Sequence, residues 1–358
     1  MGLAVAAKIS EKSQDVYVLE KNARFGQETS SHNSGVIHSG IHYPPNSLKA
    51  KLCVEGNRMT YDLCEKHNIS FKRLGKLTVA VTNEETAELE RLMHQGEENG
   101  VENLKMLGKE EVKRLEPNIE VGRALLSPST GILEPDELMN YFHAKVQKNN
   151  AFFVPKTEVT SVKRINDEYE VGGTSIDERF TIRARTVINC AGLGSDKIAS
   201  MAGLDVDRLR YTLHLCKGDY FRLIGSPLVK MLVYPVPSGP GLGIHLTPDM
   251  AGGVRLGPNA YYVDNVSYTV ESTEREFLQD VTRFLPSIMQ RRIQPDSAGV
   301  RPKLQGPRDG FRDFIIRHEA DRGLFGFISL VGIESPGLTG APAIAEYISR
   351  MYEDEIQR

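Results

Sequence analysis

Residues 15–42 read D-V-Y-V-L-E-K-N-A-R-F-G-Q-E-T-S-S-H-N-S-G-V-I-H-S-G-I-H and carry the strongest indication of the fold. The first five residues predict a short strand that ends at Glu20. More than half of the residues from Glu20 to His42 are Gly, Ser, Thr, Asn or His, a composition that disfavours a packed core. Such a segment offers hydroxyls and backbone N–H groups to a polar ligand. We expect a dinucleotide-binding fold, with Glu20 accepting a hydrogen bond from a ribose.

The residues before this strand match the end of a dinucleotide-binding fingerprint. Gly2 and Ala6 have G-x-x-x-A spacing, and Glu20 follows Gly2 by about the interval that this fold requires. The first strand and the first two glycines of the fingerprint do not precede Gly2. We therefore expect a chain that lacks the opening strand of its fold.

Alternating helices and strands predict a mixed α/β fold in two domains. Helices are expected over Leu3–Ser10, Thr82–Asn99, Lys109–Leu115, Asp136–Asn149, Ser195–Ala202, Thr273–Met289 and Ala341–Tyr352. Strands are expected over Asp15–Leu19, Phe152–Val154, Glu158–Lys163, Tyr169–Val171, Thr181–Ile188, Gly218–Leu223, Met231–Tyr234, Gly243–Leu246 and Phe327–Val331.

Composition excludes several classes of protein. The 358 residues include 44 Lys and Arg against 47 Asp and Glu, which gives no overall basic charge for binding nucleic acid. No apolar run approaches the roughly 20 residues of a membrane helix. The four cysteines have no C-x-x-C spacing, and we expect them to be reduced. The histidines and cysteines also lack metal-ligand spacing, so no metal site is predicted.

Two later segments run from an apolar strand through glycine into a helix. Val187–Gly192 reads V-I-N-C-A-G, and Gly332–Gly340 reads G-I-E-S-P-G-L-T-G. A helix N-terminus carries unpaired N–H donors and about half a positive charge, which favours negative charge on a ligand.

Together these motifs resemble the D-amino-acid-oxidase superfamily of FAD-dependent oxidoreductases, and within it the L-2-hydroxyglutarate dehydrogenases. The resemblance spans Gly2 to Ile356, and the chain departs from it at His42-Tyr43, where many members have Tyr-Tyr. The most specific segments are Ser30–Ile41, Ser47–Cys53, Leu74–Ala80 (L-G-K-L-T-V-A), Ser127–Leu133, Tyr234–Pro237, Gly241–Thr247 (G-L-G-I-H-L-T), Gly299–Lys303 (G-V-R-P-K) and Gly332–Thr339.

The resemblance implies a Rossmann-like, three-layer FAD-binding domain interleaved with a substrate domain built on an antiparallel sheet. The FAD-binding domain would comprise residues 1–74, 134–209 and 299–358, and the substrate domain 75–133 and 210–298. The residues implied to contact FAD are Gly2, Glu20, Thr29, Ser30, Ser31, His32, Asn33, Ser34, Val159, Ala191, Gly192, Gly337, Leu338 and Thr339.

The implied reaction is oxidation of L-2-hydroxyglutarate to 2-oxoglutarate by hydride transfer to flavin N5. Arg301 is the predicted carboxylate ligand, because a guanidinium matches a carboxylate bidentately. Lys51 and Lys303 are candidates for a second carboxylate, with Lys49 expected to be solvated, and Tyr43 is a candidate substrate contact. The base would be a histidine, His38 first and His245 second. Glu334 is a further candidate, whose alternative role is helix capping.

Alternatives stay open at this point. The chain could be another flavin oxidoreductase of the superfamily, a glycerol-3-phosphate dehydrogenase or an amino-acid oxidase, or a truncated chain that binds no FAD and is inactive. The expected partners are a small 2-hydroxy acid and an electron acceptor, a quinone or another. The location would be mitochondrial for a eukaryotic chain, with a targeting segment upstream of Met1, and cytoplasmic or membrane-peripheral for a bacterial one.

Overall fold

The computed structural model describes residues 1–237 and 243–356, which form two compact units. Unit 1 comprises Met1–Ser31, Pro135–Leu215 and Arg301–Arg358, and unit 2 comprises His32–Glu134 and Cys216–Val300. The first two residues of the Gly241–Thr247 motif lie outside the described residues. Within those described ranges, no helix is both long and apolar enough to cross a membrane.

Unit 1 is built around the apolar helix α1, Gly2–Ile9. Six of its eight residues are buried, and it packs against α5 (Pro135–Lys148) and α8 (Ala341–Glu355). Lys8, near its end, reaches Glu346 of α8 at 3.0 Å. The remaining helices of this unit are short: α6 (Ser195–Met201), η1 (Gly192–Gly194) and η3 (Ala320–Arg322).

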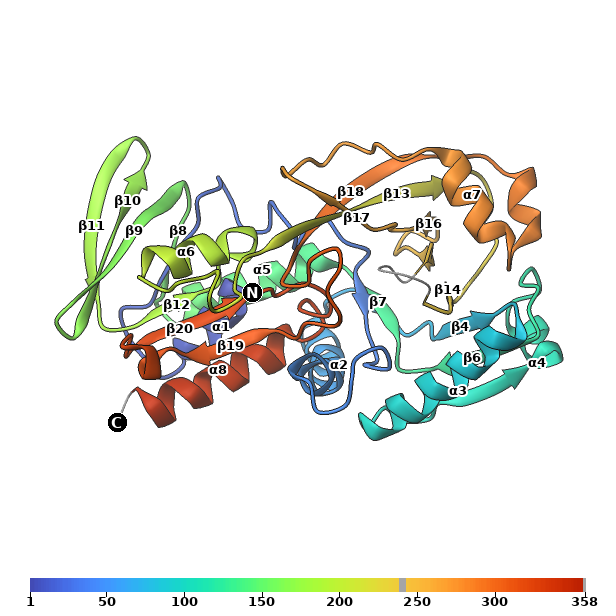
Figure 1. Ribbon diagram of the computed structural model, residues 1–358, viewed down its shortest axis with the longest axis horizontal. Coiled ribbons are helices and arrows are strands. Elements are labelled where there is room, and N and C mark those ends of the chain that lie inside the picture. Colours follow the sequence, from blue (N-terminus) through green and yellow to red (C-terminus); the bar gives the residue numbers. More distant parts are fainter. Residues whose placement is uncertain (238–242, 357–358) are drawn as a thin grey trace. The chain divides into compact units, whose positions relative to one another are not determined.

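The strands of unit 1 form three small sheets (Figure 1). The first sheet holds the parallel pair β1 (Tyr17–Leu19) and β8 (Phe152–Val154). In the second, β20 (Phe327–Val331) lies between parallel β12 (Val187–Asn189) and antiparallel β19 (Ile315–His318). The third is an antiparallel meander of β9 (Thr157–Ile165), β10 (Glu168–Ser175) and β11 (Glu178–Ala184).

Unit 2 is dominated by a mixed nine-stranded sheet in which β14 runs parallel to β4, whereas β15 and β6 run antiparallel to these two strands. Its order is β17–β13–β16–β15–β14–β4–β6–β5, with β18 also paired to β13. The strands are β4 (Lys76–Ala80), β5 (Lys105–Gly108), β6 (Arg123–Ser127), β13 (His214–Leu223), β14 (Leu232–Pro235), β15 (Leu246–Pro248), β16 (Val254–Leu256), β17 (Tyr261–Val263) and β18 (Ile293–Lys303).

The rest of unit 2 consists of a smaller sheet and several helices. The smaller, three-stranded sheet has the order β2–β7–β3. Its strands and the helices of the unit are β2 (Val36–Ile37), β3 (Phe71–Lys72), β7 (Gly131–Leu133), α2 (Leu48–His67), α3 (Asn83–Glu98), α4 (Lys109–Leu115), α7 (Glu274–Thr282) and η2 (Pro286–Gln290).

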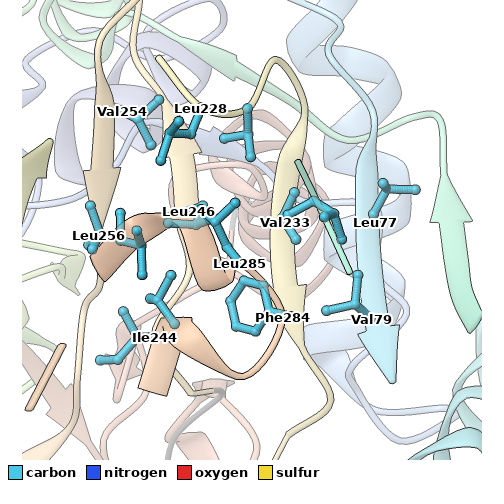
Figure 2. Packing of buried hydrophobic residues seen from close by; sticks show 14 of the residues in the cluster. Leu77, Val79, Leu228, Val233, Ile244, Leu246, Val254, Leu256, Phe284 and Leu285 are labelled. Atoms are coloured by element: carbon cyan, nitrogen blue, oxygen red, sulfur yellow. The ribbon is translucent and has the colours of Figure 1, made fainter. Parts of the chain in front are cut away.

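One face of the large sheet forms the main hydrophobic core of unit 2 (Figure 2). Leu77 and Val79 of β4 point into it, and Phe284 and Leu285 from the segment after α7 pack against them. Side chains alternate along a strand, so Lys76 and Thr78 lie on the opposite face. The core thus fixes which residues of β4 form the polar face described below.

The mixed α/β class is confirmed, with corrections to single elements. The predicted strand Thr181–Ile188 is two strands, β11 and β12, which belong to different sheets. The predicted helix Thr273–Met289 ends at Thr282, and the 3-10 turn η2 follows, because Pro286 cannot continue the helical hydrogen bonds. All four cysteines are free.

Residues 32–74 had been assigned to the FAD-binding domain, but in the structure they pack within unit 2. The boundaries near residues 134, 210 and 299 fall close to the divisions between the units. Which unit holds the flavin stays a prediction.

We expect Phe284→Ala to lower the free energy of unfolding by about 3–5 kcal/mol, because it deletes a fully buried ring. Met289→Ala, a nearby exposed position, is the control and should change it by less than about 0.5 kcal/mol. Urea unfolding followed by circular dichroism measures both. Equal effects of the two variants would contradict this account of the core.

Candidate functional site

The predicted cofactor residues Gly2 and Glu20 lie at adjoining ends of elements in unit 1. Helix α1 begins at Gly2 without a side-chain cap, which leaves N–H donors at its first turn. A β-carbon at Gly2 would lie 3.5 Å from that of Cys190, just after β12. Glu20 directly follows β1, and its carboxylate accepts a hydrogen bond from the Asn22 N–H at 2.9 Å. Glu20 and Cys190 both raise the pKa of the buried Met1 amine, against the larger effect of burial, so the ends of β1 and β12 lie beside the start of α1.

The turn after β12 leaves room for a ligand. Asn189 holds it, accepting from the Ala191 N–H at 3.2 Å and donating to the Ser195 carbonyl at 2.7 Å. Gly192 has a left-handed φ of 53°, and a β-carbon there would meet nothing within 4 Å. Ala191 and Gly192 thus offer backbone that a polar group can approach closely.

The predicted flavin contacts Gly337, Leu338 and Thr339 form a tight turn before α8. The Gly337 N–H donates to the Glu334 carbonyl at 2.6 Å, and a β-carbon on Gly337 would approach that oxygen to 2.7 Å. Thr339 is fully buried, and α8 begins with no side-chain cap. The first N–H of α8, that of Ala341, donates to the Leu338 carbonyl at 3.2 Å, and Pro342 has no N–H, so this helix start offers fewer donors than that of α1.

The segment Thr29–Ser34 spans the division between the units, which falls after Ser31. In unit 2, Asn33 accepts from the Gly35 N–H at 2.8 Å, and the His32 ring stacks on Tyr268 with centroids 3.9 Å apart. Val159, predicted to contact the adenine, lies on β9 and pairs with Gly173 of β10. Their roles toward a cofactor stay predictions.

The candidate carboxylate ligands have different surroundings. Lys303 lies 3.6 Å from Glu334, and both side chains are largely buried. Lys51 is exposed on α2, and Arg301 is half-buried on β18. Lys49 was expected to be solvated, which is wrong: only 5% of it is exposed. Arg301 and Lys303 belong to unit 1, and Lys51 to unit 2.

Both predicted bases, His38 and His245, belong to unit 2. His245 is 6% exposed and stacks on Tyr234 with centroids 3.4 Å apart. His38 is half-buried, and its carbonyl accepts from the Asn57 side chain at 2.9 Å. Tyr43, a candidate substrate contact, has its carbonyl bonded to the Asn99 side chain at 2.8 Å.

A buried lysine lies among these imidazoles, and our sequence analysis gave it no role. Lys76 is 1% exposed, and its Nζ is 2.9 Å from Nε2 of His42 and 4.9 Å above the Tyr234 ring. Burial lowers the pKa of Lys76 to about 7. Burial, followed by the positive charge of Lys76, also lowers the pKa of His42, which His38 and His245 influence as well.

The sequence holds one indication of this site, because Lys76 is the lone charged residue in the segment L-G-K-L-T-V-A. Charged residues at the start of a strand are usually solvated, so the sequence alone does not distinguish this lysine.

Two arginines on the same sheet are neutralised by carboxylates. Arg222 contacts Asp249 at 2.7 Å and Asp296 at 3.1 Å, and Arg255 contacts Asp296 at 2.8 Å. Sequence analysis had not singled out this network. Throughout residues 1–237 and 243–356, no group of three or more His, Cys, Asp or Glu side chains could hold a metal ion.

Lys76 makes stability depend on pH. Because its pKa falls on folding, the unfolded chain binds more protons between pH 7 and 10, and unfolding becomes more costly as pH rises. Relative to Lys76→Met, the wild-type free energy of unfolding should rise by about 1.4 kcal/mol per pH unit over this range. Urea unfolding of both proteins at pH 7, 8 and 9 measures the difference. A difference that does not change with pH would show that Lys76 is charged in the fold.

Comparison with known proteins shows the family of the chain. Residues 1–351 match the family model described as FAD dependent oxidoreductase (DAO). The chain is 36% identical to L-2-hydroxyglutarate dehydrogenase, mitochondrial, of Arabidopsis thaliana, covering 98% of this chain and 81% of that protein. It is 32% identical to glycerol 3-phosphate dehydrogenase of Caloramator mitchellensis, covering 97% and 71%.

A solved structure extends the likeness to the fold. Dithionite-reduced L-alpha-glycerophosphate oxidase from Mycoplasma pneumoniae, with FAD bound, superposes with a TM-score of 0.84. It is 26% identical and covers 98% of this chain and 91% of that one. The chain therefore belongs to the DAO family of FAD-dependent oxidoreductases, as its motifs predicted.

Proposed function

We propose that this enzyme oxidises L-2-hydroxyglutarate to 2-oxoglutarate. The observation that carries the proposal is the 36% identity to the Arabidopsis L-2-hydroxyglutarate dehydrogenase over almost the whole chain. The reaction requires a hydride acceptor, a group that takes the hydroxyl proton, and cations for two carboxylates. The described residues offer candidates for each.

Unit 1 fits FAD. Helix α1 begins without a side-chain cap, and the open turn at Gly192 lies beyond β12. Uncapped helix N-termini stabilise the negative charges of a pyrophosphate and of a flavin ring. Glu20, at the end of β1, is placed to accept from a ribose hydroxyl. When bound, FAD takes the hydride from the carbon that bears the hydroxyl.

The protein's own residues would orient the substrate and take its proton. Arg301 is the first candidate for one carboxylate, since its guanidinium forms two parallel hydrogen bonds. Lys51 is a better candidate for the second carboxylate than Lys303, because Lys303 already pairs with Glu334. His38 and His245 remain the candidate bases. The electrons would then pass to an acceptor such as a quinone, and a mitochondrial location is proposed for a eukaryotic source.

Glycerol 3-phosphate is the second candidate substrate. It is favoured by the Caloramator relative and by the TM-score of 0.84 to the Mycoplasma oxidase. Both substrates bear a hydroxyl on the carbon to be oxidised, but one carries two carboxylates and the other a phosphate.

Anaerobic titration of the FAD-loaded protein separates the two candidates. We expect L-2-hydroxyglutarate to bleach the flavin absorbance, and neither its D-enantiomer nor glycerol 3-phosphate to do so at the same concentration. Dithionite is the control that shows the flavin can be reduced. If glycerol 3-phosphate alone bleached the flavin, the proposed substrate would be wrong and glycerol 3-phosphate would take its place.

A further inference from the structure

We propose that Lys76 rests as a neutral amine and that the hydrogen-bonded pair of Lys76 and His42 is the final acceptor of the substrate's hydroxyl proton. The inference rests on the proposed function only in requiring the oxidation of a hydroxyl group. Lys76 acts through His42 and is therefore a positioning residue.

The contrast with a second buried lysine shows why Lys76 is neutral. Lys217 has a fully buried side chain, and it contacts the Glu271 carboxylate at 2.7 Å. Lys76 is equally buried, but among the described residues no carboxylate lies within ion-pairing distance of it. An unpaired buried ammonium costs several kcal/mol, so the group loses its proton instead. The same chain therefore holds one buried lysine that is paired and charged and one that loses its proton above about pH 7.

The groups that face Lys76 give no substitute for a carboxylate. They are the imidazole of His42, the Tyr234 ring and the Cys53 thiol, with His38 and His245 next to His42. Burial raises the pKa of the Cys53 thiol, which keeps it protonated and uncharged. Arg91 acts on His42 and makes a positive charge there less favourable still. The pair of Lys76 and His42 can therefore accept one proton, but it does not readily hold two.

The hydrogen bonding of the two ring nitrogens of His42 indicates which of them would accept the proton. Nε2 of His42 is bonded to Lys76, and Nδ1 is shielded from solvent and makes no hydrogen bond to any described residue. With Lys76 neutral, Nε2–H donates to Nζ, and Nδ1 presents a lone pair.

The proton is transferred in a balanced sequence. The substrate O–H bond would break as the hydride leaves carbon for the bound flavin, and the proton would pass to the imidazole that acts as base, His38 in our prediction. The protonated ring would then turn toward Nδ1 of His42, to which no described group is bonded at rest. As Nδ1 takes the proton, the Nε2 proton would move to Nζ and form an ammonium. No charge beyond this one proton enters the pair.

Histidine NMR tests the pair without substrate or added flavin. We would label the imidazole nitrogens with ¹⁵N and assign His42 by comparison with His42→Gln. His42 should change from the Nδ1–H tautomer to the Nε2–H tautomer as pH rises through about 7. Lys76→Arg, which stays charged, should keep Nδ1–H at every pH, and Lys76→Met should abolish the change. A wild-type tautomer that does not change with pH, or a change that persists in Lys76→Met, would overturn the proposal.

Anaerobic stopped-flow reduction supplies the kinetic test. The wild-type rate of flavin reduction should rise about tenfold per pH unit below pH 7 and level off above it, because a base must be unprotonated to act. Lys76→Arg should be slow at all pH values, and Lys217→Met should keep the wild-type profile as the matched buried-lysine control. An unchanged profile in Lys76→Met would overturn the relay. If L-2-hydroxyglutarate fails to reduce the flavin but glycerol 3-phosphate succeeds, the substrate proposal fails and the same pH series decides the relay.

Discussion

The central constraint in unit 2 is that a lysine is buried without a carboxylate beside it. The core on one face of the large sheet requires Leu77 and Val79 to point inward, and strand alternation then directs Lys76 to the other face. Of the described residues, those that it meets there are an imidazole, an aromatic ring and a thiol. A charged amine would be unfavourable in these surroundings, so the fold itself creates a proton acceptor with a pKa of about 7. That value lies where an acid–base group is most effective near neutral pH.

Unit 1 has the opposite electrostatic character, because it offers N–H donors to a negative charge. Its helix α1 begins without a side-chain cap, so the N–H groups of its first turn favour an anionic ligand. In our proposal, unit 1 carries donors suited to the negative charge of FAD, and unit 2 carries groups suited to the proton that leaves the substrate. The family resemblance accounts for the first of these features, whereas the second follows from the surroundings of Lys76 in this chain.

Much of the fold could be predicted because local patterns agree with it. Helix α4 and strands β8 and β20 have the predicted bounds, since each is short and flanked by clear turn or capping residues. The family and FAD were predicted from ordered motifs and are confirmed. The sequence could not reveal Lys76, because its burial depends on strands far apart in the chain that pair beside β4. The solvated state expected for Lys49 was wrong as well, because the sequence of α2 does not show which of its lysines the fold buries. The roles of the predicted site residues stay untested.

The uptake of a proton within the protein is the central claim, and proton release measures it most directly. FAD-loaded protein would be mixed anaerobically with substrate at pH 8 in weakly buffered solution containing an indicator dye. Wild type should release its proton after a lag behind the bleaching of the flavin, because the Lys76–His42 pair takes the proton first and then passes it to solvent at this pH, and Lys76→Met should release it without a lag. Proton release that keeps pace with bleaching in wild type would contradict the account.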